Sequence, residues 1–516
     1  MRRTYLNVAV FIAGMTTLGI ELSASRLLGN VFGTSNLVWA NIIGLMLVYL
    51  TMGYFLGGRL ADRYPHFGSF YQLLAWGAFT SGLVPIIARP VLLQAAMAVE
   101  SLDSAVMIGS FVAVLVLFII PVTILGCVSP FAIRLALTDP EQAGRTSGMI
   151  YAISTLGSIL GTFLPVLWLI PTIGTAYTFM TFSLGLLTVA LIGLGLEDRR
   201  ATLRHLWMPA LLILLAALFL SGPVKSSVGQ VFEKESTYNY IQVVERDGVR
   251  MLMLNEGQGI HSVYAPDLEA TYGTWDYFLA APFFNSPPVS IESVERIGLV
   301  GLAAGTISKQ YTKVFGPIPI DGWEIDPEIV TVGRVWFDMN EANLNAIIAD
   351  GRWGLSHSQH VYNVIGVDAY RLPYIPWHLT TREFFLEVLE HLTSDGVVVV
   401  NVGRAPDDRR IIEALVGTIG SVFTSVHVVD VPNTFNTIVY ATVQSTQPEN
   451  LVSNELMVCE NNDTSLLCDV LRRTTVNLQP TPVSDVVFTD DWAPIEQLTN
   501  STMLAFILRG NIDLLR

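Results

Sequence analysis

Residues 295–327 read ERIGLVGLAAGTISKQYTKVFGPIPIDGWEIDP. An apolar strand at Arg296–Val300 leads into a loop of small residues between Gly301 and Gly305, and a helix opens directly after this loop. The next apolar strand, Ile318–Glu324, ends in a carboxylate nineteen residues after Gly305. The loop alone fits an ordinary strand-to-helix turn equally well. Together with the acid it indicates a nucleoside site, in which the helix N-terminus presents free N–H groups and the carboxylate binds ribose hydroxyls.

Two later apolar segments, Val361–Val367 and Gly396–Val402, continue the alternation of strands with helix-like segments. This alternation predicts a mostly parallel sheet with helices on both faces, and ligands of such sheets bind beyond the carboxyl ends of the strands. Asp350 and Asp368 lie at or beside such ends. We expect Asp350 to accept a hydrogen bond from an adenine amino group and Asp368 to receive a proton from an attacking amine. The alternative for each is an acid in a solvated loop.

Residues 236–264, upstream of this region, alternate apolar and polar side chains on both sides of Asp247–Gly248, a preferred two-residue hairpin turn. The expected fold class is therefore a multi-pass α-helical membrane domain followed by a small β-hairpin unit and an α/β Rossmann-like domain of the methyltransferase type. We place the membrane domain at residues 1–223, the β unit at 224–290 and the nucleoside-binding catalytic domain at 291–516.

The membrane assignment rests on composition and on runs of apolar residues. The 516 residues are 51% hydrophobic and only 14% charged, with a mean hydropathy of +0.50, whereas soluble domains average about 25% charged residues. About 20 apolar residues cross a bilayer as a helix. No signal-peptide cleavage site follows the first apolar run. Seven runs of this kind occur: Val8–Ser23, Val38–Leu56, Tyr71–Ile87, Ile108–Leu125, Ile150–Ile170, Tyr177–Leu196 and Leu206–Leu220.

Charge is divided unequally along the chain. Residues 1–223 hold 11 Lys/Arg and 8 Asp/Glu, a net charge of +3, and residues 224–516 hold 18 and 36, a net charge of -18. Neither half carries the basic tract that nucleic-acid binding requires. With the N-terminus in the cytoplasm, nine arginines fall in inner loops and two in outer loops, which favours this orientation. Seven crossings then place the catalytic domain outside, although substrate supply favours the inside.

Two ionisable residues, Glu21 and Arg26, lie in the first apolar run and directly after it. Charges in lipid are costly, so they indicate either a polar relay or substrate path, or anchoring near a helix end, and we favour anchoring. Three cysteines are present: Cys127 in an apolar run, and Cys459 and Cys468 in a polar stretch. The last two form a disulfide in an oxidising compartment or remain as two thiols.

The second half resembles the spermidine synthase (polyamine aminopropyltransferase) family, and more closely its membrane-fused members, which carry an N-terminal multi-helix transmembrane domain. The resemblance covers roughly residues 235–440. It depends on blocks that occur in the family's order: STYNYIQV (236–243), GLAAGT (301–306), WEIDP (323–327), ADGR (349–352), VDAY (367–370) and LTTREF (379–384), with TDDWAP (489–494) near the end.

The resemblance implies a transferase that uses decarboxylated S-adenosylmethionine. An amine attacks the carbon next to the sulfonium and displaces methylthioadenosine, with Asp368 as the base. The donor-binding positions implied by the resemblance are Gly301, Ala304, Gly305, Glu324 for the ribose and Asp350 for the adenine. Tyr272 is implied as a catalytic-site residue, and Asn239 and His261 as binding residues nearby.

Three positions depart from the family's pattern. The family carries an acid where this chain has Ala304, another acid where it has Arg371, and a glutamine where it has His261. The two missing acids would serve cationic amino groups, whereas a guanidinium binds a carboxylate with two parallel hydrogen bonds. We therefore also hypothesise that Arg371 binds the carboxylate of intact S-adenosylmethionine, with lyase or cyclase chemistry that releases methylthioadenosine without a diamine.

A further alternative is a non-catalytic transporter or sensor of polyamines or nucleosides. Expected partners are a small-molecule substrate and the lipid bilayer, with no nucleic acid, and a homodimer is a candidate assembly. His357 and His360 are three residues apart but lack a third ligand, so we expect no metal site. The sequence leaves open the donor, the acceptor and the side of the membrane on which the catalytic domain lies.

Overall fold

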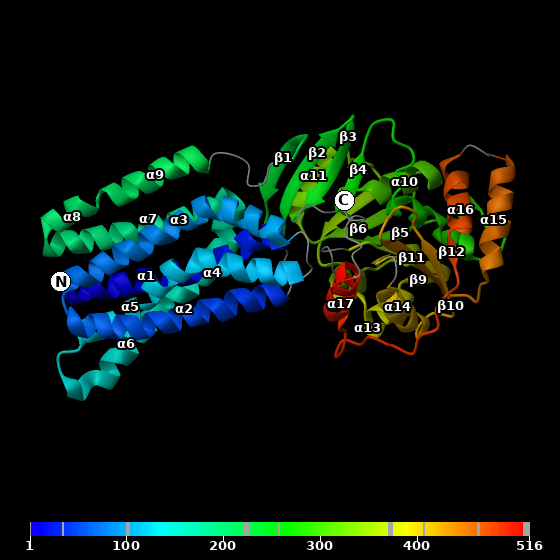
Figure 1. Cartoon of the computed structure of the whole chain (residues 1–516). Coiled ribbons are helices and arrows are strands. Elements are labelled where there is room, and N and C mark those ends of the chain that lie inside the picture. Colours follow the sequence, from blue (N-terminus) through cyan, green and yellow to red (C-terminus); the bar gives the residue numbers. More distant parts are fainter. Residues whose placement is uncertain are drawn as a thin grey trace. The chain divides into compact units, whose positions relative to one another are not determined.

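The computed structural model describes residues 2–32, 36–99, 104–220, 227–255, 259–369, 375–405, 408–461 and 465–508 (Figure 1). The chain divides into two compact units. One comprises residues 1–227 with 233–240, and the other comprises 228–232 with 241–516.

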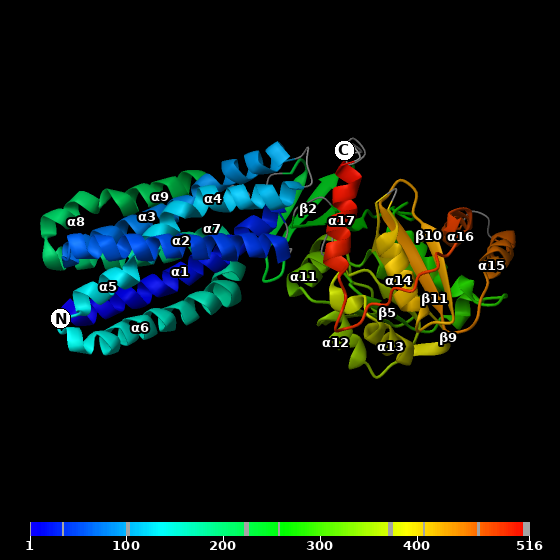
Figure 2. The ribbon, with the colours of Figure 1, turned by 60° about the horizontal axis from the view of Figure 1, so that its bottom comes forward.

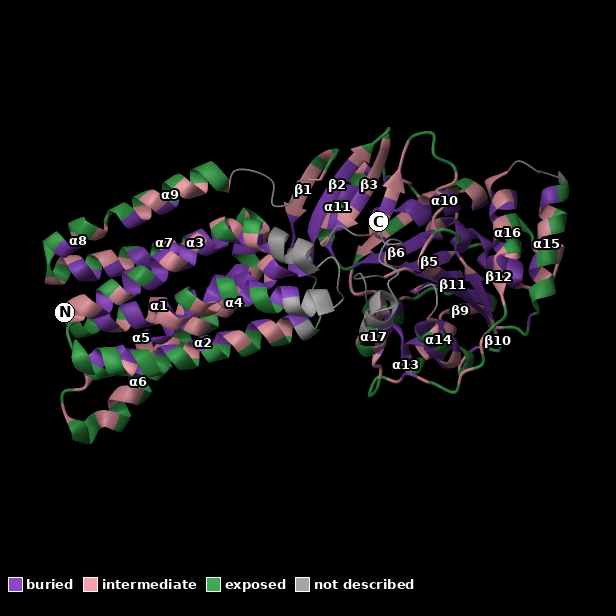
Figure 3. Cartoon of the chain, in the orientation of Figure 1, coloured by how far each residue is buried: buried purple, intermediate pink, exposed green. Residues whose placement is uncertain are grey.

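The first unit is helical. Six of its described stretches are long and apolar enough to cross a membrane, judged by length and composition. Figure 3 shows exposed surface along α2, α6 and α9, and large apolar side chains such as Phe55 and Phe163 contribute to it. An apolar exterior of this extent is typical of helices that face lipid. The helices are α1 (Arg2–Phe32), α2 (Asn36–Arg63), α3 (Phe67–Val99), α4 (Ser104–Gly126), α5 (Val128–Ala136), α6 (Ala143–Leu164), α7 (Ile170–Glu197), α8 (Arg199–His205) and α9 (Trp207–Phe219).

Glycines bring α1 and α6 into close contact. A Cβ atom at Gly157 would lie 2.0 Å from the carbonyl oxygen of Phe11, and one at Gly161 would lie 2.0 Å from that of Met15. Residue numbers increase in the same direction along both helices from the first contact to the second, so α1 and α6 are parallel. Small residues at such crossings let two backbones approach closely, which is how helices pack within a membrane.

The chain reverses between α6 and α7. The Tyr5 hydroxyl donates to the carbonyl oxygen of Val189 at 2.7 Å, and Arg2 pairs with Glu197 at 3.1 Å, so α7 is antiparallel to α1. Gly174, with φ 80° and ψ 166°, interrupts the helical conformation at the start of α7. The long apolar stretch Pro140–Glu197 is therefore two helical segments joined by a bend that favours glycine.

Residues 233–240 belong to the helical unit, and two side chains hold them there. The Arg26 guanidinium donates to the carbonyl oxygen of Tyr238 at 3.1 Å and to that of Ser236. The Thr175 hydroxyl donates to Glu235 at 2.7 Å. Arg26 thus holds residues 236–238 against the helices, and its anchoring role in a membrane stays a prediction.

The β unit is a four-stranded sheet in the order β1-β2-β3-β4. Val249 pairs with Arg246 across the predicted hairpin turn, where Asp247 and Gly248 have φ values of 50° and 78°. Positive φ at both positions is the conformation that a two-residue turn requires, and Asp-Gly adopts it readily. The strands are β1 (Gln230–Glu235), β2 (Tyr240–Arg246), β3 (Val249–Leu254) and β4 (Ile260–Tyr264).

The larger sheet has eight strands in the order β12-β10-β11-β9-β8-β5-β6-β7. The five strands from β9 to β7 are parallel, and β11 lies antiparallel between β9 and β10. This confirms the predicted parallel sheet of the methyltransferase type. The strands are β5 (Ile297–Val300), β6 (Ile320–Glu324), β7 (Leu344–Ile348), β8 (Tyr362–Val367), β9 (Leu392–Gly403), β10 (Ser425–Asp430), β11 (Asn436–Thr442) and β12 (Leu478–Gln479).

Both faces of this sheet are covered, as Figure 2 shows for α13 and α14 on one face and α15 and α16 on the other. Along β9, Val397 and Val399 enter one apolar core, and Val398 and Val400 enter the other. This alternation follows from the two-residue period of a strand. The remaining elements are three 3₁₀ segments, η3 (Thr274–Phe284), η4 (Ile291–Ser293) and η5 (Trp377–Leu379), and the helices α10 (Thr306–Phe315), α11 (Pro327–Trp336), α12 (Gly351–Ser356), α13 (Arg382–Glu390), α14 (Arg410–Gly420), α15 (Pro448–Asn461), α16 (Leu466–Val476) and α17 (Ile495–Leu508).

Candidate active site at the carboxyl edge of the sheet

The loop between β5 and α10 requires its two glycines. Gly301 has φ 92°, and a Cβ atom there would lie 2.5 Å from the carbonyl oxygen of Asp368. Gly305 has φ 84°, and its Cβ would lie 2.6 Å from the Met339 side chain. A side chain at either position would thus be strained and obstructed. Gly301 is the residue that brings the β5 loop against the end of β8.

Ala304 is 1% exposed and packs in an apolar cluster with Ile241, Val243 and Leu252. Its N–H donates to the Ser262 hydroxyl at 3.0 Å, which ties the loop to β4. A carboxylate at this position would be buried among the apolar side chains of this cluster, which is unfavourable for an ionised group that has no paired cation. The alanine is therefore a packing residue whose surroundings do not suit the acid of the family's pattern.

Glu324 ends β6, and its carboxylate turns back toward the β5 loop. One oxygen accepts from the Ala303 N–H at 3.0 Å and the other from the Asp326 N–H at 3.1 Å. Burial raises the pKa of Glu324 to about 7, although these two hydrogen bonds lower it. Each carboxylate oxygen keeps a second lone pair, so the group can still accept from a ligand hydroxyl.

Asp368 follows β8, and its N–H donates to the carbonyl oxygen of Val300 at 2.9 Å. The Asn401 amide donates to one oxygen of the Asp368 carboxylate at 2.9 Å, and Asn436 donates to Asn401 at 2.9 Å. Burial raises the pKa of Asp368 to about 6, and the Asn401 hydrogen bond opposes this. The group is thus an oriented carboxylate that is ionised at neutral pH and can accept a proton.

The sequence reasoning missed Asn401 and Asn436. Asn401 is 6% exposed and interrupts the valine run of β9. A single amide in a buried apolar strand was the available signal, because a polar group buried there requires hydrogen-bond partners.

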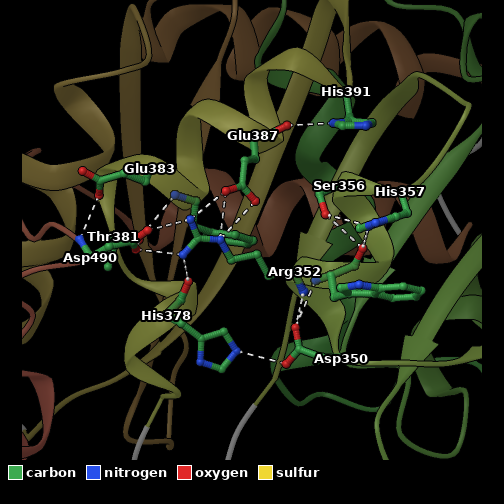
Figure 4. Close-up of polar contacts among 12 residues, drawn as sticks. Asp350, Arg352, Ser356, His357, His378, Thr381, Glu383, Glu387, His391 and Asp490 are labelled. Carbon is green, nitrogen blue, oxygen red and sulfur yellow. Dashed lines mark hydrogen bonds and ion pairs between the residues drawn. The ribbon is translucent and has the colours of Figure 1, made fainter.

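Asp350 caps the N-terminus of α12. One carboxylate oxygen accepts from the N–H groups of Arg352 and Trp353, both at 3.0 Å, and the other contacts Nε2 of His378 at 3.1 Å (Figure 4). The His378 hydrogen bond is the largest cause that holds the pKa of Asp350 below its usual range. The side chain is 38% exposed, so a ligand can still reach it while these hydrogen bonds hold the carboxylate in place.

Arg352 connects this cap to the C-terminal segment (Figure 4). Its guanidinium contacts Glu387 at 2.6 Å and Asp490 at 2.8 Å, and it donates to the carbonyl oxygen of His378 at 3.1 Å. The Thr381 hydroxyl also donates to Asp490, at 2.7 Å. The ADGR, LTTREF and TDDWAP blocks, which are far apart in the sequence, therefore meet at the Asp490 carboxylate, which contacts Arg352 and Thr381.

The structure gathers four predicted positions at the carboxyl ends of adjacent strands: Gly301 after β5, Glu324 at the end of β6, Asp350 after β7 and Asp368 after β8. His261 on β4 precedes Ser262, the residue that contacts the loop. Burial lowers the pKa of His261 to about 4, so its imidazole is neutral at physiological pH.

The remaining predicted positions are Tyr272, Asn239 and Arg371. Tyr272 is 70% exposed, and its ring lies under the Arg473 guanidinium. Asn239 belongs to the helical unit, where its N–H donates to the Ser236 hydroxyl at 2.8 Å. Arg371 lies outside the described residues.

Among the described residues, no group of three or more His, Cys, Asp or Glu side chains is arranged to hold a metal ion. His357 stacks on Trp353 instead, with ring centroids 4.3 Å apart.

Known proteins provide an independent comparison, in which no family model matches the chain. A probable polyamine aminopropyl transferase of Bifidobacterium longum is 36% identical over 213 residues, which are 41% of this chain and 46% of that protein. A polyamine aminopropyltransferase of Vibrio vulnificus is 29% identical over 202 residues, 37% of this chain and 66% of that protein. The chain is thus similar to two polyamine aminopropyltransferases over about two fifths of its length.

The match spans about half of the first relative's length and about two thirds of the second's. Among solved structures, a probable spermidine synthase from Corynebacterium glutamicum has a TM-score of 0.38 and 19% identity, covering 46% of this chain and 88% of that one. The spermidine synthase of Thermotoga maritima has a TM-score of 0.36 and 14% identity, covering 55% and 88%.

Proposed function

We propose that the chain is an aminopropyltransferase-like enzyme that acts on decarboxylated S-adenosylmethionine and an amine and releases methylthioadenosine. The observation that carries this proposal is the Asp368 carboxylate. It is oriented by Asn401 and adjoins the Gly301 loop, and its pKa of about 6 suits a base at neutral pH.

In this proposal the donor nucleoside binds along the strand ends. Glu324 accepts hydrogen bonds from the ribose hydroxyls and Asp350 accepts one from the adenine amino group, while Gly301 and Gly305 let the backbone approach the ligand. Three carboxylates also place negative charge near a sulfonium cation. Most of the rate acceleration then comes from holding two reactants in line and from this electrostatic environment.

The reaction is a displacement at carbon. The lone pair of the amine nitrogen forms a bond to the carbon next to the sulfonium, and the carbon–sulfur bond breaks with its electrons going to sulfur. Sulfur leaves as the neutral thioether of methylthioadenosine. The nitrogen gives up one proton to the ionised carboxylate of Asp368, which later releases it to solvent.

One observation favours a second candidate. Ala304 lies in an apolar cluster, so the site lacks an acid at a position where the family's pattern has one for a cationic amino group. Intact S-adenosylmethionine is then an alternative donor, with lyase or cyclase chemistry in place of transfer to a diamine. Arg371, the residue proposed to bind its carboxylate, lies outside the described residues.

The test is incubation of the purified full chain with S-adenosylmethionine or its decarboxylated form, with and without putrescine, followed by mass spectrometry. Methylthioadenosine formed only with the decarboxylated donor and putrescine supports transfer, and methylthioadenosine formed from S-adenosylmethionine alone supports the lyase. If methylthioadenosine is absent under all four conditions, both the transferase proposal and the lyase alternative are refuted. Asp368→Asn is the matched control because it removes the base and keeps the side-chain volume.

We also propose that the helical unit spans the membrane in several passes, with the catalytic domain outside the cytoplasm. The Cys459–Cys468 disulfide, with Cα atoms 5.2 Å apart, supports an oxidising compartment. Reporter fusions at the C-terminus test this: alkaline phosphatase, active only outside the cytoplasm, is expected to be active, and an active cytoplasmic reporter would contradict the orientation.

A further inference from the structure

Asp350 is the next acid beyond Glu324 along the carboxyl edge of the sheet. Glu324 at the end of β6 pairs with Ile348 at the end of β7, and the Ala349 N–H donates to the Glu324 carbonyl oxygen at 3.1 Å. Asp350 follows Ala349 directly. Neighbouring strands lie about 4.8 Å apart. A nucleoside whose ribose contacts Glu324 therefore has Asp350 as the next side chain toward its base.

The hydrogen bonds of Asp350 leave it able to take one further donor. Each carboxylate oxygen has two lone pairs. Both lone pairs of Oδ1 are used by the N–H groups of Arg352 and Trp353. Oδ2 contacts Nε2 of His378 at 3.1 Å and, among the described residues, keeps its second lone pair without a partner (Figure 4). The side chain is 38% exposed, so this lone pair is open to a ligand group that donates a hydrogen bond.

His378 holds the Oδ2 side of this carboxylate. An ionised carboxylate only accepts hydrogen bonds, so Nε2 of His378 carries the hydrogen in this contact. The His378 backbone is held in turn, because its carbonyl oxygen accepts from Nη1 of Arg352 at 3.1 Å. Arg352 is itself paired with Glu387 and Asp490. These contacts restrict rotation of the Asp350 carboxylate from both of its oxygens.

We propose that His378 is a positioning residue that makes the nucleoside site selective for a base with an amino group. It acts through Asp350: by holding Oδ2, it keeps the one open lone pair directed at the ligand. The inference rests on the proposed function, in which a nucleoside lies along the strand ends. It deepens that proposal by adding a residue that sets the choice between a 6-aminopurine and a 6-oxopurine.

The two kinds of purine differ in the group that would meet the open lone pair. The 6-amino group of adenine donates a hydrogen bond to Oδ2 of Asp350. The 6-carbonyl oxygen of hypoxanthine brings lone pairs of its own, so the carboxylate loses water without gaining a partner. Without the His378 hydrogen bond the carboxylate can turn about its Cβ–Cγ bond, and we expect the preference for the amino group to weaken.

The experiment is equilibrium binding of two neutral nucleosides to the full chain: methylthioadenosine and its 6-oxo analogue, methylthioinosine. Contacts to the ribose and the thioether are common to both, so the ratio of the two affinities reports on the base alone. We expect the wild type to bind methylthioadenosine about tenfold more tightly or better, which is the strength of a hydrogen bond to a charged group. His378→Phe, which keeps a ring but has no donor, should lower this ratio roughly three- to tenfold.

Three further variants separate positioning from structural damage, which would lower both affinities together and leave their ratio intact. His378→Gln should keep the preference, because its amide can still donate to Oδ2 of Asp350. His391→Phe removes an imidazole that contacts the Glu387 carbonyl oxygen at 2.8 Å instead, and it should leave the ratio unchanged. In an Asp350→Ser background, which keeps an oxygen that can cap α12, His378→Phe should have no further effect on the ratio.

A wild-type ratio close to one overturns the inference. So does a ratio that is unchanged in His378→Phe, that falls equally in His378→Gln, or that still responds to His378→Phe in the Asp350→Ser background. These results leave the proposed function standing, because transfer does not require selectivity for the base. A wild type that binds neither nucleoside also overturns the inference, and the proposed function fails with it if no methylthioadenosine is formed from any donor.

Discussion

Glu324 provides the most direct test of the donor site, because its protonation should control nucleoside binding. In the free protein its pKa is about 7. Ribose hydroxyls donate hydrogen bonds, so they bind the carboxylate rather than the carboxylic acid. Donor affinity should therefore rise with pH through about 7 and level off above 8.

The size of the effect follows from the pKa. With a pKa of about 7, the carboxyl is about 9% ionised at pH 6 and about 91% ionised at pH 8. Binding that requires the ionised form should therefore strengthen about tenfold between these values, or about 1.4 kcal/mol. Binding at pH 7 should release about half a proton per ligand.

The assay is calorimetric titration of the full chain with methylthioadenosine, which is neutral and has no group that titrates between pH 6 and 8. Repeating it in buffers of different ionisation enthalpy measures the proton release directly. Glu324→Gln should bind more weakly and without dependence on pH, and Asp368→Asn should retain the dependence. Affinity that is constant or falls between pH 6 and 8 in the wild type would refute the assignment of Glu324 to the ribose.

Three further predictions concern the base, the loop and the disulfide. The kcat/KM for transfer should rise with pH through about 6 as Asp368 loses its proton, and an unchanged profile in Asp368→Asn would exclude that group. Gly301→Ala should lower the free energy of unfolding by roughly 1–3 kcal/mol because of its positive φ and the nearby carbonyl oxygen, measured by denaturant unfolding; an equal stability would contradict the close approach. Replacing Cys459 and Cys468 by serine should cost about 2–3 kcal/mol, because a short loop is no longer closed in the unfolded chain; calorimetry should show a lower Tm, and an unchanged Tm would mean the bond contributes nothing.

Four of the strands that support the site could be predicted from the sequence, but the prediction missed other strands of the same sheet. The strands ending at Val300, Glu324, Val367 and near Val402 were predicted because each is an apolar run within a strand–helix alternation. β7 was missed because it is an edge strand with mixed exposure. β10 and β11 were missed because they form an antiparallel hairpin, turning at Asn433 with φ 57°, and alternation with helices predicts only parallel strands.

The positions of Glu324, Asp350 and Asp368 at strand ends were set by local patterns, because short-range spacing decides where a strand stops and a helix begins. Local patterns did not set the side chains that bind these acids or the residues beside them. Asn401 reaches Asp368 across 33 residues, and Asp490 reaches Arg352 across 138. The packing of distant elements brings these residues together. The spacing of residues within each segment does not reveal this packing.

By itself the sequence determined that apolar helices precede an α/β domain, that a glycine loop and an acid follow the first two parallel strands, and that Asp247–Gly248 closes a hairpin. These features depend on backbone conformation and on the period of burial, which a few neighbouring residues decide. Only the tertiary structure decided that Arg473 meets Asp276 across 197 residues and that residues 233–240 pack with the helices. Such contacts depend on how elements that are distant in the sequence pack. A buried charged group requires a partner, and the packing decides which residue lies beside it.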